Sequence, residues 1–146
     1  MRGSPEFAAL CRKCDSRGGL EAARNHEPYI YLCHAGIVDL AIPIILDDLY
    51  IGAFMAGQVL LDDTRDNRVL ERMLEGSGAV SDYGSDPKLG ASYQKLPYMS
   101  LQRVRALANM MLHIGNYFVE NALLKGKAGF AAVAETQAGF DASGQD

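Results

Sequence analysis

The spacing of apolar residues predicts a helix at the start of the chain. Pro5 suits the first helical position, where its missing N–H has no partner to lose. We expect the pair Gly18-Gly19 to bend or break this helix and the segment Leu20–Arg24 to resume it. The apolar positions recur at steps of three and four, which places them on one face: Phe7, Leu10, Cys11, Cys14 and Gly18.

After the turn around Pro28, the apolar period changes to two, which is typical of a strand. In the sequence PYIYLC, the side chains of Tyr29, Tyr31 and Cys33 then share one face of the strand. The side chains of Ile30 and Leu32 share the other face. This alternation predicts that the two faces of the strand lie in different environments.

Two longer apolar segments, Val38–Leu46 and Tyr50–Leu61, are predicted to form an antiparallel hairpin. The pair Asp47-Asp48 between them is typical of the tight turn that joins two such strands. Pro43 lacks the N–H that a ladder hydrogen bond needs, so we expect a sheet edge or a bulge at this position.

The second half of the chain predicts three helices. Thr64–Leu74 and Asp86–Lys95 carry short helical patterns, and Ser100 is a capping residue for the third and longest helix. We expect one of its apolar seams to cover the sheet and the other to meet a partner helix, which predicts a homodimer, although such a run is also common in a helix that only covers a sheet. The first seam is Leu101, Val104, Ala108, Met111, Gly115, Phe118 and Ala122, and the second is Leu107, Met110, Ile114 and Tyr117.

Composition limits the class of protein. A length of 146 residues suits one domain, expected over residues 1–126, and the Gly- and Ala-rich stretch 127–146 is predicted to be a flexible tail or linker. The net charge of -4 gives no general attraction for nucleic acid, so this segment is not expected to contact it. No apolar run reaches the roughly 20 residues that cross a bilayer. Three cysteines, an odd number, favour reduced thiols in the cytoplasm over a secreted disulfide framework.

The cysteines and one histidine allow several kinds of chemistry. Cys11, Cys14, Cys33 and His34 are ligand types suited to zinc or another soft metal, although the leading interpretation requires no cofactor. In a straight strand Cys33 and His34 project to opposite faces, so both reach one ion only if the chain turns at His34. The thiols are alternatively small buried hydrophobes or partners in a reversible disulfide. A redox- or metal-responsive dimerisation domain is therefore the alternative function.

Polar groups inside apolar strands predict a small binding site. A buried Asp39 carboxylate needs a partner, which is either the hydroxyls of a small oxygenated ligand or loop backbone. The Gln58 amide can both donate and accept, and Gly57 before it allows close backbone approach. Tyr31 is expected to place its hydroxyl at the rim.

Catalysis is not expected. The sequence lacks G-x-S-x-G, a P-loop and a dinucleotide-binding glycine pattern. Cys33 and His34 are adjacent in sequence, but a nucleophile needs a base brought to it in space and a third group to orient that base.

The run CRKCDSRGGLEAARNHEPYIYLCHAGIVDLAIPIILDDLYIGAFMAGQV resembles the PocR family of sensory domains. Its most specific pieces are C-x3-D followed by GGLEA, then Y-x-CHAG, the D-x3-P spacing, and G-x4-GQV. The resemblance implies an α+β, PAS-like fold, in which helices surround an antiparallel sheet that cups a ligand and a long helix follows at the C-terminal end. Family members usually carry a further segment before Pro5, so the N-terminal part of the family pattern is expected to be missing.

The same resemblance implies a function and a site. The function is that of a cytoplasmic sensory domain in a bacterial transcription regulator or signalling protein, which binds a simple hydrocarbon derivative such as a short diol and passes the signal through the C-terminal helix. Cys14 lies where relatives need not have cysteine and is not assigned to the family's site. The ligand-binding residues are then expected to be Cys11, Tyr31, Cys33, His34, Asp39 and Gln58.

Overall fold

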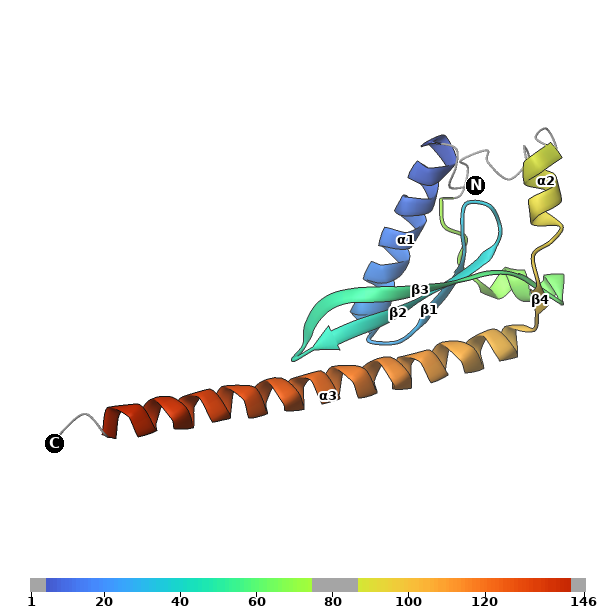
Figure 1. Cartoon of the computed structure of the whole chain (residues 1–146). Helices are drawn as coiled ribbons and strands as arrows, with labels where there is room; N and C mark the ends of the chain where they lie inside the picture. The colour runs from blue at the N-terminus through green and yellow to red at the C-terminus, as the bar shows by residue number, and fades with distance from the viewer. Residues whose placement is uncertain (1–4, 75–86, 143–146) are drawn as a thin grey trace.

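The computed structural model describes the backbone of residues 5–74 and 87–142 and the side chains of residues 5, 7–74 and 90–126. A curled sheet lies between α1 on one side and the long helix α3 on the other (Figure 1). The predicted α+β class with a long C-terminal helix is therefore confirmed. In chain order the elements are α1 (Pro5–Asn25), β1 (Tyr29–Leu32), β2 (Val38–Leu46), β3 (Leu49–Leu61), the 3-10 helix η1 (Thr64–Val69), α2 (Pro87–Tyr93), β4 (Tyr98–Met99) and α3 (Leu101–Ala142).

The sheet has four strands in the order β1-β2-β3-β4, and its first three strands are antiparallel. Asp47 and Asp48 have φ angles of 47° and 63°, which suit the tight turn of the predicted hairpin. Strand β1 pairs with β2 only as far as Ala41, so β2 is paired on one side at Pro43. A register shift follows between Ile44 and Ile45. Both alternatives predicted for Pro43, a local edge and a bulge, are thus found within two residues of it.

We predicted a bend or a break at Gly18-Gly19, and the break is not found, because helix α1 is continuous from Pro5 to Asn25. The two glycines serve packing instead. A Cβ at Gly18 would lie 2.4 Å from Cε1 of Tyr31, and a Cβ at Gly19 would lie 2.8 Å from the hydroxyl oxygen of Tyr50. The missing side chains let the helix approach the sheet closely at these two turns.

Each face of the sheet has its own apolar cluster. Tyr31 and Cys33 belong to the cluster under α1, whereas Leu32, Leu40 and Val104 belong to the cluster under α3. The period of two in the sequence of β1 therefore predicted its two environments correctly. We call the first side of the sheet the α1 face and the second side the α3 face.

The helix predicted over Thr64–Leu74 is only partly present. The 3-10 helix η1 begins after Asp63, whose carboxylate accepts a hydrogen bond from the backbone N–H of Arg65 at 2.9 Å, and it ends at Val69. Beyond it the chain is extended, and Arg72 pairs with Leu32 in an isolated parallel bridge. Pairing with β1 has therefore displaced the local helical pattern.

Helix α3 begins where the sequence predicts, because the Ser100 hydroxyl accepts a hydrogen bond from the backbone N–H of Arg103 at 3.3 Å. Its first turns pack on the sheet through the buried Leu101, Val104 and Ala108. Figure 1 shows the helix continuing well past the end of the sheet. It also includes most of the stretch 127–146 that was expected to be a flexible tail, and the predicted domain limit at 126 stays a prediction.

The remaining short helix, α2, spans Pro87–Tyr93 within the predicted Asp86–Lys95, and Asp86 itself lies outside the described residues. Across the described ranges 5–74 and 87–142, no helix has the length and apolar character that a membrane crossing needs.

Candidate functional site

The α1 face carries most of the polar groups that the sequence singled out. Tyr31 and Asp39 are direct partners across the β1–β2 ladder, so their side chains lie on the same face. Cys33 then begins a tight turn, in which its carbonyl accepts from the N–H of Gly36 at 2.8 Å and its N–H donates to the carbonyl of Ile37 at 2.8 Å. Gly36 has a φ of 69°, a conformation that glycine adopts easily.

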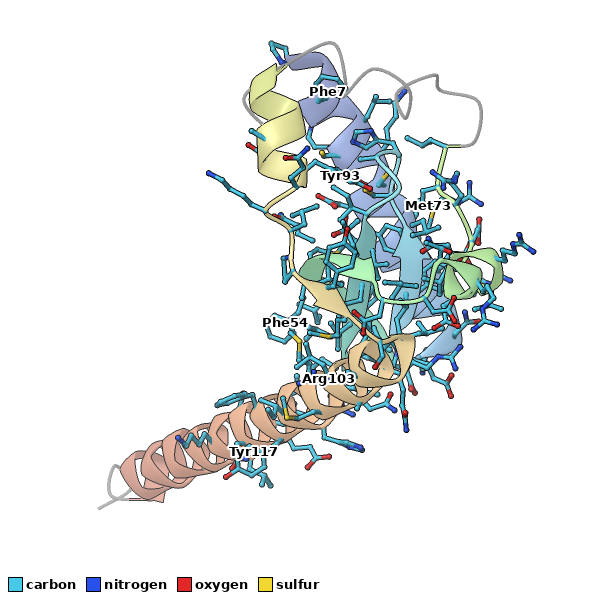
Figure 2. The ribbon with its side chains drawn as sticks, turned by 90° about the vertical axis from the view of Figure 1, so that its right-hand side faces the viewer. Phe7, Phe54, Met73, Tyr93, Arg103 and Tyr117 are labelled. Atoms are coloured by element: carbon cyan, nitrogen blue, oxygen red, sulfur yellow. The ribbon has the colours of Figure 1, made fainter. Side chains whose placement is uncertain are left out.

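The turn after β1 directs His34 toward α1. The His34 ring is 1% exposed, and its Nε2 lies 3.4 Å from Sγ of Cys11. Its backbone N–H donates to Sγ of Cys14 at 3.3 Å. The Phe7 ring stacks on the imidazole with the ring centres 6.2 Å apart. Figure 2 shows Phe7 at this end of the molecule, on the side of the sheet away from α3.

Two polar atoms of this cluster have no hydrogen-bond partner within the described part of the chain. They are the hydroxyl oxygen of Tyr31 and Nδ1 of His34. Tyr31 is fully buried beneath Gly18, so the expectation that its hydroxyl reaches a rim is not met. Buried polar groups in proteins are nearly always hydrogen-bonded, and each exception needs an explanation.

Burial disfavours the charged forms of four side chains on the α1 face, namely Cys14, Cys33, Tyr31 and His34. It raises the pKa of Cys33 to about 12 and also raises the pKa of Cys14 and of Tyr31. The same desolvation lowers the pKa of His34. At neutral pH the thiols of Cys14 and Cys33 and the phenol of Tyr31 are therefore protonated, and the imidazole of His34 is uncharged.

Asp39 and Gln58 meet in a different way from the one expected. Val38 pairs with Val59 and Asp39 with Gly57, so Gln58 is the extra residue of a β-bulge, with a φ of 63°. The Asp39 carboxylate accepts the backbone N–H of Gln58 at 3.1 Å, while the Gln58 side chain is exposed. A Cβ at Gly57 would lie 2.6 Å from atoms of Asp39, which confirms that this glycine permits a close approach.

The four residues proposed as soft-metal ligands do not have the arrangement of a metal site. The chain does turn at His34, as a shared site would require, and Cys11 and Cys14 both contact this residue. Nevertheless, no group of three or more His, Cys, Asp or Glu side chains in the described ranges is placed to hold an ion.

Comparison with known proteins identifies the family of the chain. The family described as the sensory domain found in PocR matches residues 1–123. The chain belongs to the PocR sensory-domain family. The Regulatory protein PocR of Salmonella typhimurium strain LT2 is 36% identical over 126 residues, which make up 86% of this chain and 38% of that protein. The chain thus spans well under half the length of this relative. No solved structure matched the chain.

This PocR-family domain has one further buried polar group that the sequence did not indicate. Nη1 of Arg72 is buried without a hydrogen-bond partner among the described residues, and a Cβ at Gly36 would lie 3.2 Å from it. Arg72 follows η1, in the segment predicted to be helical, so no sequence pattern brought it toward the turn after β1.

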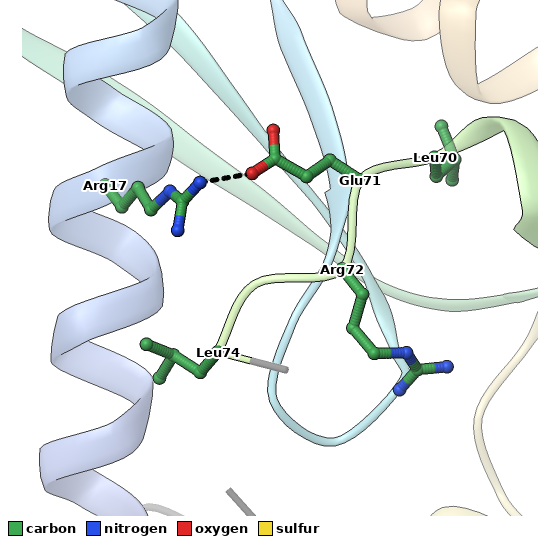
Figure 3. A pocket seen from close by; sticks show the side chains of 5 residues that line it. All are labelled: Arg17, Leu70, Glu71, Arg72 and Leu74. Carbon is green, nitrogen blue, oxygen red and sulfur yellow. Dashed lines mark hydrogen bonds and ion pairs between the residues drawn. The ribbon is translucent and has the colours of Figure 1, made fainter. Parts of the chain in front are cut away.

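Beside Arg72 the surface is hollowed between α1 and the extended segment that follows η1. In Figure 3 the guanidinium of Arg17 reaches the Glu71 carboxylate across this hollow, and Arg72 points away from them toward the turn after β1. The Tyr29 hydroxyl also donates to Glu71. The hollow is lined by Arg17, Leu70, Glu71, Arg72 and Leu74.

Proposed function

We propose that this PocR-family domain is the cytoplasmic ligand-sensing part of a bacterial transcription regulator. The ligand is a small oxygenated hydrocarbon derivative, such as a short diol, bound on the α1 face. Membership of a sensory-domain family supports sensing, and the name of the Salmonella relative supports a regulatory role.

The hydroxyl of Tyr31 and Nδ1 of His34, which have no hydrogen-bond partner among the described residues, carry this proposal. Leaving a buried polar group without a partner costs about 1–3 kcal/mol. A ligand hydroxyl can donate and accept, so it can satisfy a phenol and either tautomer of a neutral imidazole. The surrounding cluster is apolar and includes Cys33, Ile37 and Met73, which favours a ligand with a hydrocarbon part.

Binding is favoured over catalysis by the state of the thiols. Burial raises the pKa of Cys33 to about 12 and raises the pKa of Cys14, so neither supplies a thiolate nucleophile at neutral pH. The Cys11–His34 contact brings a thiol and an imidazole together at 3.4 Å. A Cys-His nucleophile also needs a group that orients the base, and Nδ1 of His34 has no such partner among the described residues.

Helix α3 is the route that we propose for the signal. Strands β1 and β2 contribute Tyr31 and Ala41 to the α1 face, and they contribute Leu32 and Leu40 to the cluster that contacts α3. A ligand that binds one position of these strands more tightly than another shifts the balance between two positions of the helix. Two copies of the chain are proposed to meet along α3.

A matched pair of tyrosine variants tests the ligand site. In Tyr31→Phe the unpaired buried hydroxyl is lost, so stability should be unchanged or rise by about 1 kcal/mol, and the response to ligand should disappear. In Tyr29→Phe the hydrogen bond to Glu71 is lost, so stability should fall by about 1 kcal/mol while the response remains.

The measurement is the thermal unfolding midpoint with and without ethanol, ethane-1,2-diol, propane-1,2-diol and glycerol. At least one of these compounds should raise the midpoint of the parent and of Tyr29→Phe but not that of Tyr31→Phe. A panel that moves none of the three midpoints would remove the ligand assignment.

A further inference from the structure

Helix α3 exposes a second line of apolar side chains that the described part of its own chain does not cover. Met110, Ile114 and Tyr117 are 51%, 47% and 63% exposed, although they are large and apolar. The sheet takes up a different side of the helix, through Leu101, Val104 and Ala108. We call this line the outer seam. It consists of the exposed apolar residues Leu107, Met110, Ile114, Tyr117 and Leu124 and of the half-buried, polar Asn121.

We propose that the outer seam packs against the outer seam of a second copy as a parallel, in-register, two-stranded coiled coil. This inference rests on the proposed dimer through α3 and adds its orientation, its register and the residues that set both. The members of the seam follow one another at steps of three and four, which is the a and d pattern of heptads. An amphipathic helix that only covers a sheet needs one such seam, whereas α3 has two.

Asn121 gives the first argument for the orientation. Within the seam it occupies an a position, between the d positions Tyr117 and Leu124. One N–H of its amide donates to the Tyr117 carbonyl at 2.8 Å. In a parallel, in-register pair the two Asn121 side chains face each other, and their amides can bond across the interface. A single asparagine at an a position fixes register and favours two strands.

Charge complementarity gives the second argument. Glu120 and Lys125 lie at the g and e positions that flank the seam, five residues apart. At that spacing they do not face each other on one helix. In a parallel pair, Glu120 of each copy lies beside Lys125 of the other, because g pairs with the e position of the next heptad. An antiparallel pair would instead bring g beside g and e beside e.

Cross-linking tests the orientation directly in the full chain. Asn121→Cys should form a covalent dimer under mild oxidation, because identical a positions lie side by side only in a parallel, in-register pair. Asn116→Cys, on the exposed outer side of the same helix, is the matched control and should give no more covalent dimer than the parent with its own cysteines. Equal cross-linking of the two variants would overturn the proposal.

Sedimentation of charge variants tests the pairing independently. Glu120→Lys and Lys125→Glu should each weaken the dimer about three- to tenfold, and the double variant should restore it to within about twofold. Ile114→Asp, at an exposed position, should weaken the dimer at least about tenfold without unfolding the chain.

The outcomes separate the claims. A monomeric parent would overturn both the dimer and its orientation, without bearing on the diol response. A stable dimer in which the double charge variant stays as weak as the single variants would leave the dimer standing and overturn the parallel arrangement.

Discussion

His34 shows how one buried side chain couples the fold to pH. Burial lowers its pKa below the ordinary value of about 6.5, because desolvation opposes the charged ring. The unfolded chain therefore binds this proton more readily than the folded one. The stability contributed by the neutral ring is complete above about pH 6.5 and is lost as the pH falls through the unfolded and then the folded pKa.

We expect the thermal unfolding midpoint of the parent to fall between pH 7 and pH 5. His34→Gln should flatten this dependence, whatever its midpoint at pH 7. His113→Gln, on the exposed surface of α3, is the control and should keep the parent's dependence. The same slope in the parent and in His34→Gln would contradict the assignment.

The three thiols should differ in reactivity. Cys11 is half-buried, whereas Cys14 and Cys33 are 1% and 6% exposed and have raised pKa values. Iodoacetamide at pH 7.5 should therefore label Cys11 first, and the other two only as fast as the domain opens. Peptide mass spectrometry measures the three rates. Labelling of Cys33 as fast as Cys11 would favour the redox-responsive alternative.

Part of the site could be predicted residue by residue. The period of two along β1 places Tyr31 and Cys33 on one face, and the structure agrees. The register of β1 and β2, which the sequence did not give, adds Asp39 to that face. Gln58 does not follow this rule, because a bulge takes it out of register and exposes its side chain. Whether any of the predicted residues binds a ligand stays a prediction.

Among the elements, α1 and α3 each contain a glycine whose replacement by alanine should change the stability of the fold, and the two changes should have opposite signs. A Cβ at Gly18 would meet the buried Tyr31 ring at 2.4 Å, so Gly18→Ala should cost about 1–3 kcal/mol. A Cβ at Gly115 would lie 3.4 Å from the half-exposed Phe54 ring, an ordinary contact. Because glycine disfavours a helix interior, Gly115→Ala should gain about 0.5–1 kcal/mol.

Denaturant unfolding of the two variants measures both changes of free energy. If Gly18→Ala were as stable as the parent, the close packing of α1 on β1 would be wrong. Gly115→Ala is the internal control for the effect of alanine on helix propensity.

Elements with a long, regular pattern were predictable, and elements set by tertiary contacts were not. The hairpin and α3 carry their own signals in Asp47-Asp48 and Ser100. The segment after Val69 has a helical pattern, yet Leu32 donates to the Glu71 carbonyl and accepts from the Met73 N–H, which holds it extended. The close packing of α1 at Gly18 likewise depends on Tyr31, a contact that no local pattern indicates.

At the scale of the whole molecule, one sheet connects two surfaces for which we propose different roles. Its α1 face holds the unpaired polar groups, and its α3 face holds the helix whose outer seam is exposed. Neighbouring residues of β1 and β2 point to opposite faces, so a movement of these strands changes the packing on both faces at once. This arrangement supports a sensor whose ligand changes the position of α3 within a dimer.

The central claim is that a small oxygenated molecule bonds to the unpaired groups under α1. The most direct measurement is the nitrogen NMR signal of the His34 ring during titration with propane-1,2-diol, with His113 as an internal reference. We expect a saturable shift of the His34 Nδ1 signal, absent in Tyr31→Phe, while His113 stays constant. A diol that leaves His34 unchanged, or that shifts both histidines linearly without saturation, would contradict the account.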